Sequence, residues 1–383
     1  MNQFLKSFLT SLMIGFPAAV FIILFLWWRQ APAPETDYLN YHSQETGNQP
    51  SLEEKFEFPD IEPEEAENEL QENELQPVTL SFAGDVYFSE LAIENYEKNG
   101  ISGLVDEEML ELMKSSDRFM LNHEFAFSNR GEPMEDKQYT LRTDPRYVSI
   151  LQDLGTDLVS IANNHILDFG QEAFLDTLDT LQNAQISYIG GGKNIDEASA
   201  PEKWEIQGHS IAVFAATRVS PSYDWYAGKD HPGVLQTYDA DRLNQAIAEA
   251  EENFDHTIVF VHWGVERSEV PEEYQRTLAK GYIDAGADLV IGCHPHVLQG
   301  FEFYKGVPIV YSLGNYLFGN RTGETVLLQA IFEENGDLTL KLIPCKRVQG
   351  VLTRISDPDT LFSHLTEISF GAAVSQGGIV LEN

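Results

Sequence analysis

The sequence predicts an α/β fold that contains parallel and antiparallel strands, and two observations carry that prediction. From residue 77 onward, short runs of β-branched and other apolar residues alternate with longer stretches of helical periodicity, which is typical of α/β proteins. Late in the chain, two apolar runs flank Asn335-Gly336, a dipeptide typical of the turn between antiparallel strands. We therefore expect a mixed sheet.

Each strand is predicted from a short apolar run, and each helix from a longer stretch between two such runs. The predicted strands are 78–83, 119–122, 158–162, 186–189, 211–215, 257–261, 289–292 and 308–312. The predicted helices are 171–182, 241–250 and 272–285. The hairpin strands are 325–332 and 338–342, and the last segment, 350–383, is expected to form a helix and then a loop with a short apolar end.

The N-terminal segment 8–28 contains no charged residue. About 21 residues at 1.5 Å each span roughly 30 Å, the thickness of a bilayer core. Lys6 and Arg29 flank the segment, and Trp27 and Trp28 lie where an aromatic belt is usual. We expect one uncleaved membrane-spanning helix with the N-terminus in the cytoplasm and the globular part outside the cell membrane. A cleaved signal peptide is the alternative, but its apolar core would be long for that class.

Residues 30–76 differ sharply in composition, with 14 acidic residues, one basic residue and several prolines. Such a segment repels itself and offers no wide apolar face, so we expect a disordered, extended stalk. The chain is thus divided into a membrane anchor (1–29), the acidic stalk (30–76), a globular domain (77–349) and a C-terminal extension packed on that domain (350–383).

Composition excludes several classes of function. The chain has 24 basic and 61 acidic residues, a net charge of −37, so nucleic acid is not an expected partner because phosphate backbones are held by Lys and Arg. The two cysteines, Cys293 and Cys345, are too few for a disulfide-dense scaffold or a four-cysteine zinc site. Packing in the core is favoured for Cys293, with a disulfide to Cys345 as the alternative.

Polar residues gather where the predicted strands end. The six strand ends are Gly84-Asp85, Asn122-His123-Glu124, Asn163-Asn164-His165 with Asp168, His262-Trp263-Gly264, His294-Pro295-His296 and Gly314-Asn315. In open α/β sheets, ligands bind outside the carboxyl ends of the strands, so these side chains are expected to meet in one crevice. Carboxylate, amide and imidazole groups suit Zn²⁺, Mn²⁺ or Fe²⁺.

Each of these residues also has a simpler interpretation. A single histidine after a strand is more often a hydrogen-bonded loop residue, and paired asparagines are common in turns because Asn tolerates the left-handed conformation. The two imidazoles of His294-Pro295-His296 are the strongest signal, since both can reach neighbouring ions. Taken together, the strand ends predict a divalent metal centre.

The motifs SFAGD, NHE, SIANNHILDFG, VHWG and GADLVIGCHPHVLQGFEFYKGVPIVYSLGN occur in this order. This ordered set resembles the CapA family of capsule-synthesis proteins, which includes poly-γ-glutamate synthesis and export proteins and belongs to the calcineurin-like metallophosphoesterase superfamily. The resemblance covers residues from about 78 to 345. It implies a four-layer αββα sandwich with a two-metal site at one sheet edge, where the ions activate a water and clamp a phosphate oxygen.

The resemblance also implies roles for individual residues. The implied metal ligands are Asp85, Glu124, Asn164, His262, His294 and His296. Asp85 and His296 would hold one ion, with Glu124 as a possible bridge to the other. His165 would be the catalytic residue that assists the leaving group or orients phosphate.

Two departures from the superfamily pattern affect this expectation. Tyr87 stands where typical phosphatases have the histidine of Asp-x-His, and Asn122-His123-Glu124 replaces Gly-Asp-x-x-Asp. One ion therefore loses an imidazole. His123 either compensates or, as a strand neighbour of the ligands, faces the other way. If it does not compensate, one of the two metal sites is expected to be weak or empty.

Two arginines are candidates for holding an anionic substrate group. Arg142 lies in the loop sequence TLRTDP, and Arg218 follows the predicted strand 211–215. Guanidinium groups bind carboxylate and phosphate through paired hydrogen bonds. The alternative for Arg142 is an ordinary surface loop position.

We expect a membrane-anchored, extracytoplasmic CapA-type protein with a metal-dependent, hydrolase-like site. The implied partners are an anionic surface polymer, membrane-bound polymer synthase components and, through residues 8–28, the lipid bilayer. Two alternatives remain at this point. One is a non-catalytic polymer-binding or scaffold component, and the other is a general metal-dependent phosphoesterase, because the fold alone does not determine the function.

Overall fold

The computed structural model describes residues 75–319 and 323–383. The predicted membrane anchor and all but the last two residues of the predicted stalk lie outside this part. Within the described residues, no helix is both long and apolar enough to cross a membrane.

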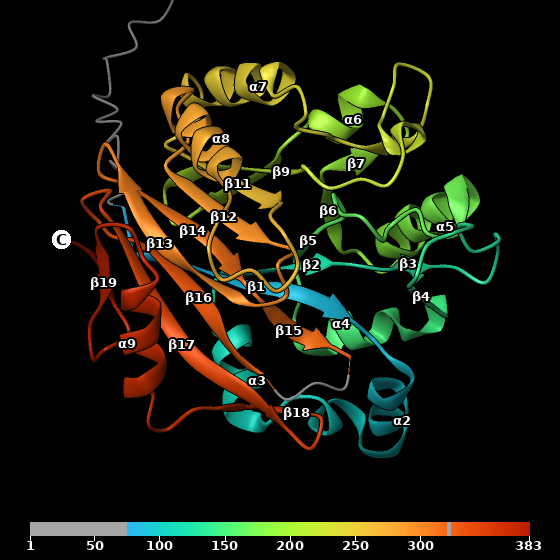
Figure 1. The fold of residues 1–383 in the computed structure, drawn as a ribbon, viewed down its shortest axis with the longest axis horizontal. Helices are drawn as coiled ribbons and strands as arrows, with labels where there is room; N and C mark the ends of the chain where they lie inside the picture. Colours follow the sequence, from blue (N-terminus) through green and yellow to red (C-terminus); the bar gives the residue numbers. More distant parts are fainter. Residues whose placement is uncertain (1–74, 320–322) are drawn as a thin grey trace, which may run out of the picture. The chain divides into compact units, whose positions relative to one another are not determined.

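The larger of two main sheets has the strand order β18-β17-β16-β1-β2-β5-β6, with β15 also paired to β1 (Figure 1). Its strands are β1 (Val78–Tyr87), β2 (Arg118–His123), β5 (Leu158–Ser160), β6 (Ser187–Ile189), β15 (Asn315–Phe318), β16 (Glu324–Phe332), β17 (Leu338–Val348) and β18 (Val351–Arg354). The strands β1, β2, β5 and β6 run parallel, and β16 to β18 extend the sheet with antiparallel pairs. We call this the first sheet.

The second sheet has the order β13-β14-β12-β11-β9-β8. Its strands are β8 (Glu202–Ile206), β9 (His209–Thr217), β11 (His256–His262), β12 (Leu289–Cys293), β13 (Leu298–Tyr304) and β14 (Val307–Leu313). The four central strands are parallel, and the edge strands β8 and β13 are antiparallel. Both sheets are therefore mixed, and the predicted α/β fold with parallel and antiparallel strands is confirmed.

The two sheets pack face to face through one apolar core. Phe82 and Met120 from the first sheet and Val213, Phe260 and Ile291 from the second belong to it, all buried. Neighbours along a strand point to opposite faces, so each sheet also presents an apolar outer face for helices to cover.

Helices cover both outer faces, which gives four layers (Figure 1). On the first sheet lie α2 (Glu90–Asn99), α3 (Glu107–Lys114), α4 (Val148–Leu154) and α5 (Gly170–Asn183), and on the second lie α6 (Ile195–Ser199), α7 (Asp241–Glu251) and α8 (Glu273–Asp284). Local sequence explains where these helices begin. Asp106 caps α3 by accepting a hydrogen bond of 2.9 Å from the backbone N–H of Met109, and Glu272 and Gln275 form a capping box at α8.

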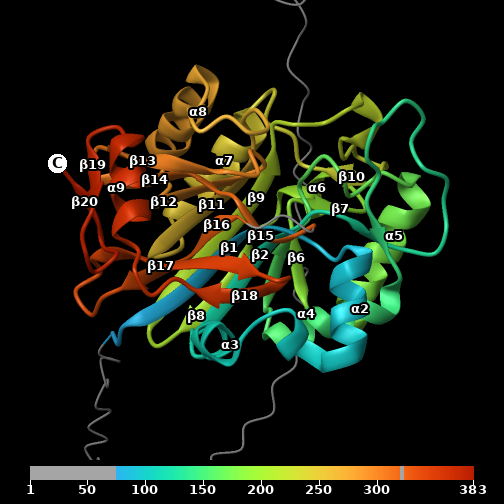
Figure 2. The same cartoon turned by 60° about the horizontal axis from the view of Figure 1, so that its bottom comes forward.

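The remaining elements are short. They are β3 (Ala126–Phe127), β4 (Arg142–Thr143), β7 (Gly191–Gly192), β10 (Gly233–Val234), α9 (Asp359–Glu367), β19 (Ala372–Val374), β20 (Val380–Glu382) and the 3₁₀ turns Gly100–Gly103, Pro145–Tyr147 and Tyr223–Trp225. Helix α9 lies against β13, and β19 and β20 lie beside it (Figure 2).

The predicted hairpin is present as β16 and β17, although its turn is longer than a two-residue type. Phe332 pairs with Leu338, and Asn335 stabilises the connection by accepting a hydrogen bond of 3.1 Å from the N–H of Asp337.

Two features of the C-terminal segment were not predicted. Strand β18 joins the first sheet, and the expected final loop contains the antiparallel pair β19–β20.

Candidate metal centre

The centre begins at an irregular end of β1. The pairing of β1 with β2 shifts register between Ala83 and Asp85. A Cβ atom at Gly84 would lie 1.9 Å from the carbonyl oxygen of Gly314, so only glycine fits there. The backbone N–H of Asp85 donates to the same carbonyl at 2.9 Å. This close approach of the two chain segments holds the carboxylate of Asp85 at the edge of the sheet.

The buried carboxylate of Asp85 accepts hydrogen bonds from several sides. The amide of Asn122 donates at 2.8 Å, and the backbone N–H of His294 donates to both oxygens at 3.2 Å. Nδ1 of His296 lies 3.2 Å from Oδ2. Burial alone would raise the pKa of Asp85, but the hydrogen bond and charge of His296 lower it below the usual value.

Two groups of side chains could hold metal ions. The ligand atoms of Asp85, His262 and Cys293 lie within 4.8 Å of one another, and so do those of Glu124, His294 and His296. The groups adjoin, because Oε1 of Glu124 lies 3.7 Å from Nε2 of His262. We call these six residues the cluster.

Two buried ligand atoms of the cluster have no hydrogen-bond partner among the described residues. They are Oε1 of Glu124 and Nδ1 of His294. Buried polar atoms are nearly always paired in native proteins, and exceptions point to a missing ion or water. An oxygen and a nitrogen left open inside a ring of imidazole and carboxylate groups therefore fit a divalent cation.

The charge states in the cluster agree with this interpretation. Burial, together with the neighbouring His296, lowers the pKa of His294 to about 3, and burial lowers the pKa of His262 well below its usual value. Both imidazoles are therefore neutral, the form that binds metal. Burial and the nearby Asp85 raise the pKa of Glu124 well above its usual value. A bound cation would offset both the cost of burying this carboxylate and its repulsion from Asp85.

Asn164 and His165 follow β5 and reach the same edge. Oδ1 of Asn164 lies 2.9 Å from Nε2 of His262, a spacing that lets both atoms face one ion. Nδ1 of His165 lies 2.6 Å from Oδ2 of the buried Asp168, and burial lowers the pKa of His165. The other ring nitrogen of His165 is left for a ligand.

Lys137 is a functional candidate that the sequence did not indicate. Its Nζ donates to the carboxylate of Asp168 and to the backbone carbonyl of Asn164, and it lies 3.2 Å from Nδ1 of His165. Burial lowers its pKa. Lys137 lies in a turn-rich segment without strand or helix periodicity, so no sequence signal linked it to the strand ends.

Two other residues were noted in the sequence without an assigned role at the metal. Oδ1 of Asn315 lies 2.9 Å from Nδ1 of His296. Sγ of Cys293 lies 3.4 Å from Nδ1 of His262, which explains its place in a ligand group. Cys293 is buried, as favoured from the sequence, and both Cys293 and Cys345 are free, so the alternative disulfide is not formed.

The structure does not bring His123 to the cluster. Asn122 and Glu124 point toward it, whereas His123 lies on the opposite face, with ring centroids 3.9 Å from Phe125 and 4.8 Å from Phe127. Burial lowers the pKa of His123 to about 3. His123 therefore does not replace the imidazole that is absent at Tyr87.

Neither predicted substrate arginine pairs its side chain with the cluster, although the backbone N–H of Arg218 donates to the carbonyl of His262 at 2.8 Å. The exposed Arg142 donates to the carbonyl oxygens of Arg130 and Gly131, at 3.2 and 3.4 Å, and its guanidinium covers the ring of Phe169 at 4.0 Å. Arg218 lies 3.6 Å above the ring centroid of Tyr238. Neither lines the cavities that border the cluster.

Two cavities border the cluster and share Arg267, His296 and Asn315. One, of about 270 Å³, is also lined by His165 and Tyr87. The other, of about 330 Å³, extends toward Arg347. The structure thus provides space for a ligand on two sides of His296.

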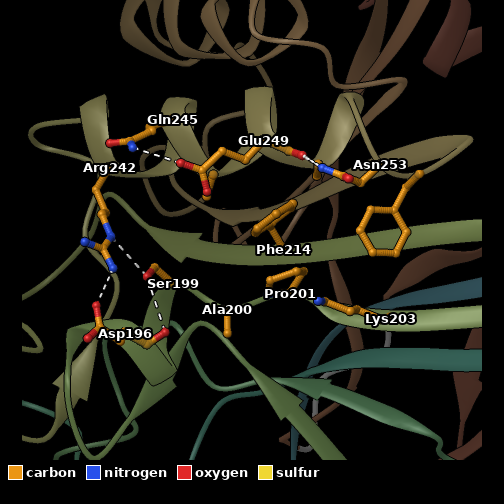
Figure 3. Close-up of a pocket in the computed structure, with 13 residues that line it drawn as sticks. Asp196, Ser199, Ala200, Pro201, Lys203, Phe214, Arg242, Gln245, Glu249 and Asn253 are labelled. Carbon is orange, nitrogen blue, oxygen red and sulfur yellow. Dashed lines mark hydrogen bonds and ion pairs between the residues drawn. The ribbon is translucent and has the colours of Figure 1, made fainter. Parts of the chain in front are cut away.

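A larger cavity of about 520 Å³ lies between α6, β8 and α7 (Figure 3). Its polar groups are paired with one another. Arg242 donates to Asp196 at 2.6 Å and to Ser199 at 3.1 Å, and Gln245 donates to Glu249 at 2.9 Å. This cavity shares no lining residue with the cluster and presents no open ligand atom, so it is not the candidate site.

Residues 79–320 match the model of a family described as "Bacterial capsule synthesis protein PGA_cap". The PGA biosynthesis protein CapA of Bacillus subtilis is 31% identical over 272 residues, covering 70% of this chain and 71% of that protein. The capsule biosynthesis protein CapA of Bacillus anthracis is 29% identical over 332 residues, covering 83% and 80%.

Solved structures are less similar. A hypothetical protein from Thermus thermophilus aligns with a TM-score of 0.45 and 16% identity, over 71% of this chain and all of that one. The NAD nucleotidase (NadN) of Haemophilus influenzae aligns with a TM-score of 0.42 and 12% identity, over 77% and 57%.

Proposed function

The chain belongs to the bacterial capsule synthesis family PGA_cap, and we propose that this protein hydrolyses a bond in an anionic capsule polymer at a metal centre. The names of its relatives, which refer to PGA and capsule biosynthesis, support poly-γ-glutamate as that polymer. One observation carries the proposal of hydrolysis. Two buried ligand atoms without partners among the described residues, on Glu124 and His294, belong to a cluster whose member His296 lines a cavity together with His165.

The proposed ligands follow the metallophosphoesterase arrangement that the sequence motifs resemble. One ion would be held by Asp85, Glu124 and His296, and the other by Asn164, His262 and His294. This division redistributes the two adjoining groups of ligand atoms and leaves out Cys293, because burial raises the pKa of its thiol well above the usual value. The contacts of 3.2 Å between Asp85 and His296 and of 2.9 Å between Asn164 and His262 support this division. When bound, the ions would polarise the bond under attack and lower the pKa of a water molecule so that it becomes a nucleophile near neutral pH.

The chain's own residues would supply the proton for the leaving group. Asp168 accepts a hydrogen bond from Nδ1–H of His165 at 2.6 Å and would stabilise the imidazolium form of that ring, whose Nε2–H would donate its proton to the departing nitrogen or oxygen. Lys137 ties the same carboxylate to the backbone of Asn164. These contacts therefore fix the position of the proposed acid His165 relative to the proposed metal ligand Asn164.

A second function has one specific observation in its favour. Tyr87 lacks the imidazole of the common metal motif, and no histidine of the described part of the chain takes its place, because His123 faces away from the cluster. A single well-held ion can bind polymer carboxylates without cleaving the chain. In that case the protein would hold polymer for the synthesis complex rather than hydrolyse it.

We further propose that residues 8–28 anchor the protein and that its globular part works outside the cell membrane. The uncharged length of this segment and its basic flanks support that topology. The polymer and the membrane-bound components that make it would then meet the protein at the membrane surface.

The experiment is an assay of the full-length protein in detergent, with Mn²⁺ and two substrates. These are poly-γ-glutamate, followed by chain length, and a chromogenic phosphodiester. We expect Mn²⁺-dependent shortening of the polymer that is lost in His294→Ala and kept in His231→Ala. His231 contacts Gln171 and belongs to neither ligand group. Metal binding without cleavage of either substrate would favour polymer holding, and cleavage of the phosphodiester alone would favour a general phosphoesterase.

A further inference from the structure

Within residues 75–319 and 323–383, Arg347 is a buried cation without a counter-ion. Only 6% of its surface is exposed, and it forms no ion pair with a carboxylate of the described residues. Its guanidinium donates to the backbone carbonyls of Phe318, Gly319 and Gly350, while its Nε has no partner in that part of the chain. Buried charges are normally paired, and a chain with 61 acidic residues offers many carboxylates for that purpose.

A second arginine lines the same cavity of about 330 Å³. Arg267 has a positive φ of 63°, a conformation that costs energy for a residue other than glycine and that clusters at functional sites. Its backbone N–H donates to the carbonyl of Pro295 at 2.7 Å, next to His294 and His296. Its side chain forms no hydrogen bond or ion pair with the described residues, so the guanidinium is available to a ligand.

The acidic residues of this cavity do not neutralise the two arginines. Glu269 and Glu324, which both line the cavity, are exposed. Water screens an exposed carboxylate, whereas the field of the buried Arg347 is screened much less. The inner part of the cavity therefore attracts anions.

The other walls indicate what kind of anion fits. Val297, Leu298 and Leu361 line the cavity together with the arginines. A free phosphate gains nothing from apolar walls, whereas a carboxylate carried on methylene groups can use both surfaces. His296 and Asn315 are shared with the cavity that His165 lines, so an anion held here lies next to the metal centre.

We propose that the cavity between Arg267 and Arg347 is a subsite for the carboxylate groups of an acidic peptide polymer. It holds the repeat unit beside the bond that faces the cluster. The identity of the ligand rests on the proposed function, whereas the existence of an anion subsite rests on the two arginines alone. This subsite also explains how a strongly acidic protein can hold a polyanion, since the attraction is confined to one cavity.

The test measures binding rather than cleavage. A fluorescently labelled γ-linked hexaglutamate is titrated with the metal-free, full-length protein in detergent, and its anisotropy is followed. We expect Arg267→Ala and Arg347→Met each to weaken binding about 10- to 100-fold, because hydrogen bonds to charged groups contribute roughly 1.5–3 kcal/mol each. Arg142→Ala is the matched control, since that exposed arginine lies outside the cavity, and its binding should equal that of the wild type.

Three further measurements complete the test. Circular dichroism establishes whether Arg347→Met is folded. If that variant is unfolded, Arg267→Ala still tests the proposal, because Arg267 is exposed and its replacement should not disturb the fold. A γ-linked hexamer of isoglutamine, in which α-carboxamides replace the free carboxylates, should bind at least 10-fold more weakly than hexaglutamate, and inorganic phosphate should not displace hexaglutamate at equal charge. The His294→Ala variant should lose metal but still bind hexaglutamate. Binding to the subsite would therefore stand even if the proposed hydrolysis is wrong.

Unchanged binding in a folded Arg267→Ala variant would overturn the proposal. Displacement of the probe by phosphate at equal charge would show that the cavity takes phosphate instead. A loss of binding in Arg142→Ala equal to that in Arg267→Ala would show a diffuse attraction rather than a subsite.

Discussion

The most informative prediction concerns the different roles of the adjacent residues Asn164 and His165. Nε2 of His262 lies 2.9 Å from the amide oxygen of Asn164, whereas His165 contacts Asp168 at 2.6 Å. Replacing Asn164 by Ala should remove a metal ligand, and with it both the bound ion and turnover. Replacing His165 by Ala should leave the metal in place, because its bonded nitrogen faces Asp168 rather than the cluster.

The size of the effect follows from the role of His165 as a proton donor. General acid catalysis typically contributes about 10²–10⁴-fold in rate, so His165→Ala should lose about 1,000-fold, roughly 4 kcal/mol of transition-state stabilisation. A substrate with a good leaving group needs less protonation. It should therefore recover part of the rate in His165→Ala and none in Asn164→Ala.

The assay combines metal analysis with turnover of two phosphodiesters that differ in the pKa of the leaving group. His231→Ala serves as the control for a histidine outside the cluster. Equal metal loss in His165→Ala and Asn164→Ala would refute the assignment of their roles. An identical rate loss with both substrates would refute proton donation by His165.

Three further predictions concern stability, the sheet edge and topology. Glu302→Gln should lower the free energy of unfolding by about 2 kcal/mol at pH 7, because the carboxylate accepts two hydrogen bonds from Arg276 and one from Tyr311 and such pairs are costly to break when partly buried. Burial alone would raise the pKa of Glu302, but Arg276 helps to lower it to about 2. The charged network therefore stabilises the fold fully above pH 4.5 and loses this effect as the carboxylate is protonated at lower pH. In urea titrations, the stability difference between wild type and variant should disappear as the pH falls toward 2. Gly84→Ala should cost about 1–3 kcal/mol through overpacking against Gly314 and should reduce metal content, whereas Gly281→Ala, with open space around its Cβ position, should do neither. Protease added to intact cells should release a soluble fragment by cutting within 30–76, and full protection of the globular part would contradict the proposed orientation.

Much of the fold could be predicted because its central strands are short apolar runs that end in polar motifs. The run 257–261 and the strand His256–His262 agree closely, as do 289–292 and Leu289–Cys293. Strands β19 and β20 were not predicted because each spans three residues. In such short segments the pairing partner, rather than local periodicity, decides the structure.

The candidate site was predictable to the extent that it follows strand ends. The alternation of side chains at the end of β2 separates His123 from Asn122 and from Glu124, the first residue after the strand, and only the structure settled which face each occupies. Lys137, Arg267 and Arg347 could not be found in this way. They come from loops and from the end of the long strand β17, and tertiary folding alone brings them beside the cluster.

The same limit explains why Arg142 and Arg218 were chosen from the sequence. An arginine near a motif resembles a substrate ligand, but its side chain can equally cover an aromatic ring, as both do here. What distinguishes Arg347 is burial without a counter-ion, a property that only the structure reveals.

The central claim is that the buried cluster holds metal, and the direct measurement is the metal content of the full-length protein by inductively coupled plasma mass spectrometry. The protein is purified without chelator and dialysed against Mn²⁺. We predict one to two equivalents of divalent metal in the wild type and in His231→Ala, and less than half of that in folded His294→Ala and Glu124→Gln. Wild-type metal content in both cluster variants, or no metal in the wild type, would contradict the account.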